Sequence, residues 1–363
     1  MQGSLEESKM AVCIVMPALN PDKGVLKYID GLMKAGLNKI IVVNDGSDSE
    51  HDVIFDEIAQ RPECNVIRHP VNLGKGRALK DAFEFYLTSY EKEYKGVITV
   101  DSDGQHTIDD VIKIAKILEK NEDKLILGTR DFNQSNVPWK SSFGNKMTSA
   151  VVKLLWGEKI SDTQTGLRGI PNRYLREFLT VSGERFEYEM NMLLYCITSQ
   201  ISIYEETIHT IYENNNKSTH FNPVKDSLRI YKLIFGTFFK YIFSSLSASI
   251  IDLLTFQILI LIVSGVKLQN QILIATVIAR IISSIYNYLL NAHVVFQTTE
   301  KISKTIVGYY LLAIVQMLCS WAFVYLLAIK LQLPKVVIKM LVDTALFFIS
   351  YRIQKKYIFS ERV

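Results

Sequence analysis

The chain has 363 residues, with 41 Lys and Arg against 37 Asp and Glu. At roughly 150 residues per domain, this length predicts two or three domains and excludes a small disulfide-stapled module. The first 235 residues carry 29 basic and 33 acidic side chains, whereas the remainder carries 12 and 4. The acidic first part argues against a nucleic-acid partner, and the sparse charge of the second part predicts a segment in lipid.

Strands and helices alternate in the pattern of the first 130 residues. Short apolar segments rich in β-branched residues predict strands at 11–16, 39–43, 65–68, 96–100 and 124–127. The segments between them predict helices at 22–35, 52–60, 76–90 and 108–120. This alternation is typical of a mostly parallel sheet with helices on both faces, so we expect an α/β domain over residues 1–221.

A polar cluster follows each of the five predicted strands. In chain order the clusters are PALNP (17–21), NDGSD (44–48), NLGKGR (72–77), DSDGQH (101–106) and GTR (128–130). Ligands of such sheets bind beyond the carboxyl ends of the strands. The five clusters are therefore predicted to converge on one site.

The fourth cluster has the chemistry of a metal site. Asp101, Asp103 and Gln105 alternate directly after the apolar segment GVITV, and hard oxygen ligands of this kind suit Mg²⁺ or Mn²⁺ that bridges substrate phosphates. The chain lacks the full G-x-x-x-x-G-K-[ST] pattern, and no G-x-G-x-x-G follows the first strand. ATP hydrolysis and dinucleotide redox chemistry therefore lack their usual motifs.

The second part of the chain has the pattern of a membrane domain. Residues 222–240 alternate basic and apolar side chains, which predicts an amphipathic helix in the headgroup layer. Four apolar stretches follow at 241–263, 272–292, 306–329 and 336–357. Each is near the ~20 residues that cross ~30 Å of hydrocarbon. We expect an all-α membrane domain of four transmembrane helices over residues 241–363.

Positive charge is unevenly distributed among the loops between these stretches. Most Lys and Arg lie before the first stretch, between the second and third, and at the end of the chain: Lys225, Arg229, Lys232, Lys240, Lys301, Lys304, Arg352, Lys355, Lys356 and Arg362. Basic loops stay on the cytoplasmic side. The pattern predicts a multi-pass protein of the cell membrane, with its first domain and both termini in the cytoplasm.

The cysteines and the first nine residues agree with this location. The four cysteines form neither a C-x-x-C pair nor a disulfide-like spacing, so we expect buried thiols in a reducing compartment: Cys13, Cys64, Cys196 and Cys319. Residues 1–9 are polar and acidic, unlike the basic start and apolar stretch of a signal peptide.

Four charged residues interrupt the apolar stretches: Asp252, Arg280, Lys339 and Asp343. Charges in lipid indicate a polar interior or a function, and mutual pairing that holds the helices together is an equal alternative. Asp343 lies four residues after Lys339, so these two share one helix face and can pair locally.

Six segments occur in an order that resembles a known family: VVNDGSD, NLGKGRAL, VDSDGQH, LGTR, DTQTGLRG (162–169) and FEYEMNML (186–193). From about residue 11 to 229 the chain is similar to the inverting GT-A glycosyltransferases of family 2, in the dolichol-phosphate mannose synthase-like, or polyprenyl-phosphate glycosyltransferase, branch. ARIISSIYNYLLNAHVVF (279–296) and the KKYIF ending resemble the GtrA-like membrane domain. The resemblance implies a GT-A domain joined to four transmembrane helices.

The resemblance also implies roles for individual residues. Catalysis would involve Asp103, Arg130 and Asp162. The nucleotide would contact Pro17, Asn20, Asp45, Asn72, Gly74, Lys75 and Asp101. The divalent metal, Mg²⁺ or Mn²⁺, would be held by Asp101, Asp103 and Gln105. The sugar and the acceptor would contact Lys146, Gln164, Thr165, Arg168, Lys217 and Ser218.

The sequence departs from the family pattern at two places. PALNP stands where P-x-Y-N-E is usual, which leaves the base contacts open. Relatives often carry an arginine for the lipid phosphate after the GTR motif, and this chain offers Lys140 or Lys146 there. Glu187 and Glu189 are also open, because an acidic pair and a helix-start or packing role suit them equally.

The expected reaction is inverting transfer of one sugar from a nucleotide sugar to polyprenyl phosphate. A phosphate monoester has a second pKa near 6, so the acceptor is largely ionised and needs cationic groups more than a strong base. The alternatives are a processive polysaccharide synthase and a membrane domain that flips lipid-linked sugars. The sequence leaves open whether GDP-mannose or a UDP-hexose is the donor, which polyprenol accepts, and whether the chain forms a homo-oligomer.

Overall fold

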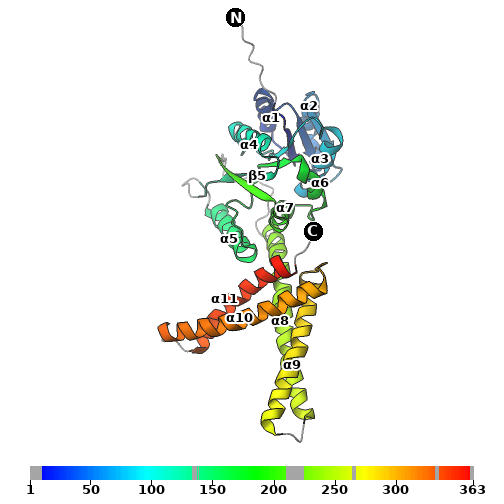
Figure 1. The fold of residues 1–363 in the computed structure, drawn as a ribbon. Coiled ribbons are helices and arrows are strands. Elements are labelled where there is room, and N and C mark those ends of the chain that lie inside the picture. Colours follow the sequence, from blue (N-terminus) through cyan, green and yellow to red (C-terminus); the bar gives the residue numbers. More distant parts are fainter. Residues whose placement is uncertain are drawn as a thin grey trace. The chain divides into compact units, whose positions relative to one another are not determined.

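The computed structural model describes residues 10–132, 137, 139–209, 225–263, 267–331 and 335–359. The chain divides into one unit of residues 1–153 and 158–230 and a second of residues 154–157 and 231–363. The first unit contains a seven-stranded sheet, and the second is helical (Figure 1).

The sheet is mixed and mostly parallel, with the order β3-β2-β1-β4-β6-β5-β7. Its strands are β1 (Cys13–Ala18), β2 (Ile40–Asn44), β3 (Cys64–Arg68), β4 (Gly96–Thr99), β5 (Lys124–Arg130), β6 (Arg168–Pro171) and β7 (Ser202–Ile208). Only β6 runs against its neighbours, pairing antiparallel with both β4 and β5. The predicted α/β class is confirmed, and the five predicted strands correspond to β1 to β5.

Seven α-helices belong to the described part of this unit. They are α1 (Gly24–Lys34), α2 (Asp52–Ala59), α3 (Lys75–Ser89), α4 (Ile108–Lys120), α5 (Trp139–Trp156), α6 (Asn172–Thr180) and α7 (Glu187–Thr198). The four helices predicted from the sequence correspond to α1 to α4. Thr107 caps α4, where its Oγ1 accepts a hydrogen bond from the Asp110 amide and so satisfies a free donor of the first turn.

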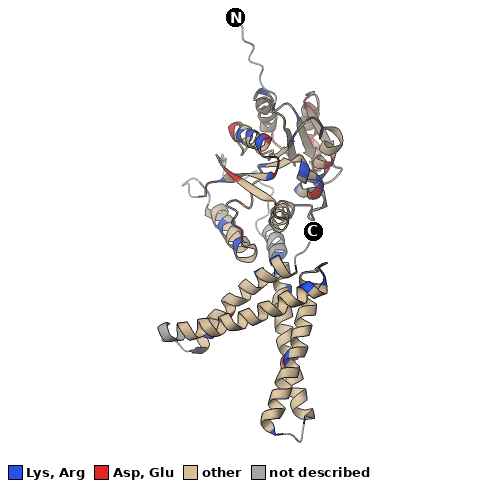
Figure 2. Cartoon of the chain, in the orientation of Figure 1, with Lys and Arg blue, Asp and Glu red and all other residues tan. Residues whose placement is uncertain are grey.

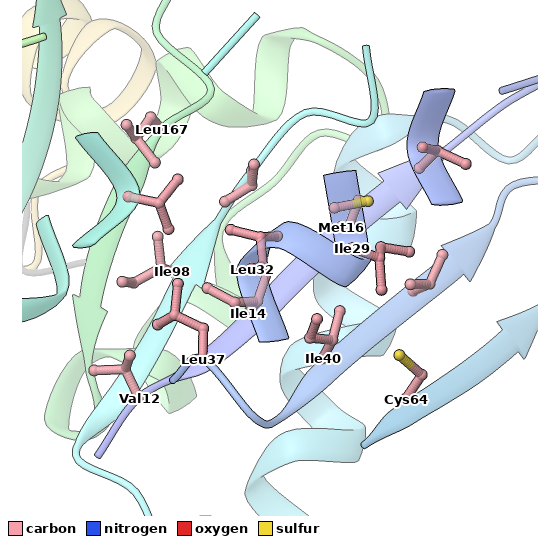
Figure 3. Close-up of a cluster of buried hydrophobic side chains, with 14 of the residues drawn as sticks. Val12, Ile14, Met16, Ile29, Leu32, Leu37, Ile40, Cys64, Ile98 and Leu167 are labelled. Carbon is pink, nitrogen blue, oxygen red and sulfur yellow. The ribbon is translucent and has the colours of Figure 1, made fainter. Parts of the chain in front are cut away.

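The sheet is buried on both faces because side chains of a strand alternate between them. Ile14 and Met16 of β1 pack on one face with Ile29 and Leu32 of α1, as Figure 3 shows. Cys13 and Val15 point to the opposite core, which includes α3, α6 and α7. Because helices cover both faces, polar side chains of the sheet reach solvent at the ends of the strands.

The second unit is built from two helical hairpins. Its elements are α8 (Lys225–Ile262), α9 (Leu268–Leu290), a π-helical turn η3 (Asn291–Val295), α10 (Ile302–Leu331), α11 (Lys335–Ile353) and a second π-helical turn η4 (Gln354–Ile358). Residues 225–240, predicted as a separate interfacial helix, continue without a break into the first apolar stretch as part of α8.

Three described helices are long and apolar enough to cross a membrane: Phe235–Ile262, Leu268–Val295 and Ile302–Leu327. Few charged residues colour these ribbons in Figure 2. The sequence predicted four such helices, and α11 does not qualify because Lys339, Asp343 and Arg352 lie within its 19 residues. On length and composition, the described residues therefore contain three candidate spans where the sequence predicted four.

The charged residues of the hairpins pair with one another. Asp252 of α8 accepts a hydrogen bond from Ser283 Oγ of α9 at 2.8 Å and lies 3.5 Å from Arg280. In the other hairpin, the Lys339 ammonium lies 2.8 Å from Asp343, which accepts a hydrogen bond from Ser320 Oγ of α10 at 2.6 Å. The predicted local pairing of Lys339 and Asp343 is confirmed, and in each hairpin one carboxylate contacts one cation and one serine hydroxyl.

The two hairpins meet through equivalent residues of η3 and η4. Asn291 Nδ2 donates to Gln354 Oε1 at 3.0 Å across 63 positions of sequence. The rings of Phe296 and Phe359, at the same spacing, stack with centroids 5.3 Å apart. The endings YLLNAHVVF and YRIQKKYIF, which start at residues 288 and 351, thus meet through residues at corresponding positions.

The predicted burial of the cysteines is confirmed for three thiols. Cys13, Cys64 and Cys196 are buried, whereas Cys319 is half-buried in α10. All four are free.

Candidate active site

The carboxylate of Asp45 fastens the loop before α3 to the end of β2. It accepts hydrogen bonds from the amides of Leu73 and Gly74, both at 2.9 Å, and lies 2.8 Å from His69 Nδ1. Gly74 has a φ of 107°, and a Cβ there would lie 2.4 Å from the Glu184 carbonyl oxygen. Only glycine fits this turn, and the turn makes Lys75 the first residue of α3.

The loops after β1 and β2 are joined by Asn20. Its Nδ2 donates to Asp48 at 2.8 Å, its Oδ1 accepts from the Asp48 amide, and its own amide donates to Ser47 Oγ. Asn20 also has a φ of 47°, a left-handed conformation that asparagine tolerates better than most residues. Of the other predicted nucleotide contacts, Pro17 is buried inside β1 opposite Val43. Asn72 is exposed, and its Oδ1 accepts from Arg185.

A lysine lies between two carboxylates at the end of β4. Lys75 Nζ is 2.7 Å from Asp101 Oδ1 and 2.9 Å from Glu189 Oε2. His106 Nε2 lies 3.6 Å from the other oxygen of Asp101. Sequence positions 75, 101 and 189 are thereby brought into one ion-paired group.

The electrostatics of this group are set by burial and by neighbouring charge. Burial alone would lower the pKa of Lys75, but Asp101 and Glu189 raise it above its usual value. Burial alone would raise the pKa of Asp101, but Lys75 and His106 lower it. Burial and then the negative charge of Asp101 raise the pKa of Asp103. The negative charge of Asp101 therefore disfavours ionisation of Asp103, and a bound cation would offset this effect.

The residues predicted to hold a divalent metal fit such an ion. Asp103 Oδ1 accepts from the Gln105 amide at 3.1 Å, and Gly104 has a φ of 72° with no atom within 4 Å of an added Cβ. The turn is therefore open beside two carboxylates. The described residues contain no cluster of three or more His, Cys, Asp and Glu able to enclose a metal. Two carboxylates in an open turn match an ion that keeps positions for substrate phosphates.

Glycine is required beside Asp101. A Cβ on Gly166 would lie 2.1 Å from Asp101 Oδ2 and 2.8 Å from Oδ1. The Gly166 carbonyl is held by Thr99 Oγ1, which donates to it at 2.7 Å from the last residue of β4. The Gly166 backbone therefore limits where the Asp101 carboxylate can lie.

Arg130, the last residue of β5, is held by Asp162. Its Nε and Nη2 donate to the two oxygens of Asp162 at 2.7 and 2.9 Å, and its backbone amide donates to the same carboxylate at 3.2 Å. Asp162 is fully buried and also accepts from the Gln164 amide. The geometry makes Asp162 the residue that positions Arg130.

The residues predicted for the sugar and the acceptor are divided by burial. Arg168 is fully buried and donates to the carbonyl oxygens of Thr165 and Glu189 at 3.0 and 2.7 Å. Thr165 Oγ1 donates to the Gly128 carbonyl. Lys146 and Gln164 are exposed. Lys217 and Ser218 lie outside the described residues.

Sequence reasoning missed three features of the site. Glu189, left open between two roles, is the second carboxylate of Lys75. His69 contacts Asp45, and Gly166 contacts Asp101. Each feature depends on a neighbour distant in sequence. Glu189 lies in the FEYEM segment and Gly166 in the DTQTGLRG segment, but neither local pattern specifies the contact.

Comparison with protein families identifies both parts of the chain. Residues 13–179 match the family described as Glycosyl transferase family 2. Residues 235–359 match the family described as GtrA/DPMS, transmembrane domain. The chain is a family 2 glycosyltransferase fused to a GtrA/DPMS transmembrane domain. This glycosyltransferase is thus an enzyme of the predicted class.

Two relatives of the glycosyltransferase cover 61% and 45% of its chain. It is 25% identical over 240 residues to a UDP-N-acetylglucosamine--dolichyl-phosphate N-acetylglucosaminyltransferase of Methanococcus voltae, covering 61% of this chain and 94% of the relative. It is 24% identical over 180 residues to a dolichyl-phosphate beta-glucosyltransferase of Trichomonas vaginalis, covering 45% and 54%. A mannosyl-3-phosphoglycerate synthase structure from Rubrobacter xylanophilus has a TM-score of 0.43 at 14% identity, covering 61% and 70%.

Proposed function

We propose that this glycosyltransferase transfers one sugar, with inversion, from a nucleotide sugar to a polyprenyl phosphate, giving a lipid-linked sugar. One observation carries the proposal: a half-buried lysine and two aspartates of a GT-A-like site occur on the same chain as a GtrA/DPMS transmembrane domain. The names of two relatives, which act on dolichyl phosphate, support the same acceptor class.

The charges at the strand ends suit a diphosphate leaving group. A divalent metal, when bound by Asp101, Asp103 and Gln105, supplies positive charge to the diphosphate. Arg130 supplies a second positive charge, and Asp162 fixes the direction of its guanidinium through two hydrogen bonds. Because β4 and β5 both run antiparallel to β6, their carboxyl ends lie at one edge of the sheet. Preorganised cations there stabilise charge that develops as the sugar bond breaks.

The acceptor needs orientation more than deprotonation. Its phosphate is largely ionised at neutral pH, since the second pKa of a phosphate monoester is near 6. His106 faces the Asp101 carboxylate at 3.6 Å. The site therefore works without a histidine base, and the exposed Lys146 and Gln164 supply polar contacts for the acceptor.

We propose that the membrane domain brings the acceptor to this site. Lys232 and Lys240 of α8 would lie at the headgroups on the cytoplasmic side, together with Lys301 and Lys304, in agreement with the positive-inside rule. The α11 helix would complete a four-helix membrane domain, because Lys339 and Asp343 neutralise each other. The catalytic unit and both termini would then face the cytoplasm.

A transfer assay tests this function. The full-length protein in detergent receives a radiolabelled UDP- or GDP-sugar, undecaprenyl or dolichyl phosphate, and Mg²⁺ or Mn²⁺. We expect a product that dissolves in chloroform and migrates as a single lipid-linked sugar on thin-layer plates. Asp101→Asn with Asp103→Asn should abolish it, and Lys116→Gln, an exposed change on α4, should not.

The same assay separates the alternatives. A polymer that stays at the origin would indicate a processive synthase. Flipping of preformed lipid-linked sugar that survives Asp101→Asn with Asp103→Asn would indicate a transport function of the membrane domain. Absence of any transfer with every donor and acceptor would refute the proposal.

A further inference from the structure

Lys75 contacts a carboxylate oxygen that is also expected to bind the metal. Its ammonium lies 2.7 Å from Asp101 Oδ1, an oxygen of the carboxylate expected to bind the metal. The same ammonium lies 2.9 Å from Glu189 Oε2. Lys75 therefore has a second anionic partner within hydrogen-bond distance before any metal arrives.

Glu189 is built into the site from two directions. It lies in the first turn of α7, and its backbone carbonyl accepts from the fully buried Arg168 at 2.7 Å. Its side chain is 9% exposed. Among the atoms that the structure describes, Glu189 Oε1 has no hydrogen-bond partner. Glu189 can therefore accept a further hydrogen bond from the Lys75 ammonium through Oε1.

Two cations cannot share Asp101 without repulsion. A dication on the Asp101 carboxylate and an ammonium 2.7 Å from the same oxygen repel strongly in a partly buried site. The Lys75 side chain is only 16% exposed, and leaving for solvent would break its contact with Glu189 as well as the one with Asp101. Among the described residues, Glu189 is the second carboxylate that the ammonium contacts.

We propose that Lys75 is an internal counter-ion that occupies Asp101 in the metal-free enzyme, and that Glu189 is the carboxylate to which it moves when a divalent metal binds. Glu189 is then a positioning residue that sets metal affinity through Lys75 and is not itself a ligand. The inference rests on the metal site of the proposed function and adds two residues that govern its occupancy.

Mn²⁺ binding without donor tests the inference. Free Mn²⁺ is measured by electron paramagnetic resonance during titration of the full-length protein in detergent. We expect Glu189→Gln to weaken Mn²⁺ binding about 10–100-fold, the usual range for residues behind the ligands, because Lys75 then has only Asp101. Glu187→Gln, two residues away in the same helix turn, should bind Mn²⁺ like the wild type. Lys75→Met should bind it more tightly.

The double variant gives the decisive result. Lys75→Met with Glu189→Gln should regain wild-type affinity or better, because no ammonium remains to compete. If the loss caused by Glu189→Gln persists in the double variant, Glu189 is a ligand or a structural residue and the inference is wrong. Unchanged affinity in Glu189→Gln also overturns it. Should Glu189→Gln fail to fold, Lys75→Met alone and the double variant must show equal affinity.

Failure of this inference is distinguishable from failure of the proposed function. A wild-type chain that makes lipid-linked sugar and binds no Mn²⁺ keeps the function and overturns the counter-ion exchange. A chain that binds Mn²⁺ with the predicted order of affinities and transfers no sugar keeps the exchange and refutes the function.

Discussion

Gly166→Ala tests whether the position of the Asp101 carboxylate controls the chemistry. An alanine Cβ would lie 2.1 Å from Asp101 Oδ2, whereas ordinary contact begins at 3.4 Å, so the oxygen must move by the difference, about 1.3 Å. Metal–ligand distances tolerate about 0.2 Å, and a misplacement near 1 Å costs about 100-fold in rate. We therefore expect kcat/KM to fall about 100-fold, or ~2.7 kcal/mol of transition-state stabilisation.

The assay is the initial rate of lipid-linked sugar formation with purified full-length protein, alongside Mn²⁺ titration. Gly144→Ala is the matched control, since apart from the helix's own backbone no atom of the described residues lies within 4 Å of an added Cβ at this helical position. It should keep wild-type activity. Thermal unfolding of both variants separates a displaced carboxylate from a lost fold. Wild-type rate and Mn²⁺ affinity in a folded Gly166→Ala protein would refute the reasoning, because Asp101 could then move without consequence.

Three further predictions concern stability and thiol reactivity. Asp162→Asn should lower the thermal midpoint in detergent, because breaking a buried pair such as Asp162 with Arg130 costs about 3–5 kcal/mol; an unchanged midpoint would contradict this. Ser283→Ala should destabilise the α8–α9 hairpin by only about 0.6 kcal/mol, the average for hydrogen bonds between membrane helices; loss of folded protein would contradict it. Burial raises the pKa of Cys196 to about 12, so its thiol stays protonated from about pH 7 to 9 and should resist alkylation until unfolding. Rapid labelling of Cys196 in the folded protein would show that this side chain is accessible.

The elements that position the site were predictable where local pattern and topology agree. Asp45, Lys75 and Asp101 follow strands or begin a helix at one edge of a parallel sheet, so their convergence follows from chain direction. The antiparallel β6 was not predicted, because RGIP is four residues long and owes its strand form to β4 and β5 on either side.

The remaining roles depend on contacts that no local pattern contains. The sequence predicts that Arg168 binds the sugar or the acceptor. In the structure it is fully buried and donates to two carbonyl oxygens. Glu189 gains its role from Lys75, which is more than a hundred positions away. In the membrane domain, hydropathy identified the apolar stretches. The charged residues Lys339, Asp343 and Arg352 make α11 too polar to count as a candidate span.

The two hairpins of the membrane domain are joined through residues at corresponding positions of their endings. One amide donates and its counterpart accepts across the joint, and two phenylalanines stack beside them. Gln354 Nε2 also donates to Tyr241 Oη of α8 and Ser350 Oγ of α11, both at 3.0 Å. Sliding of one hairpin against the other would therefore break several of these contacts at once.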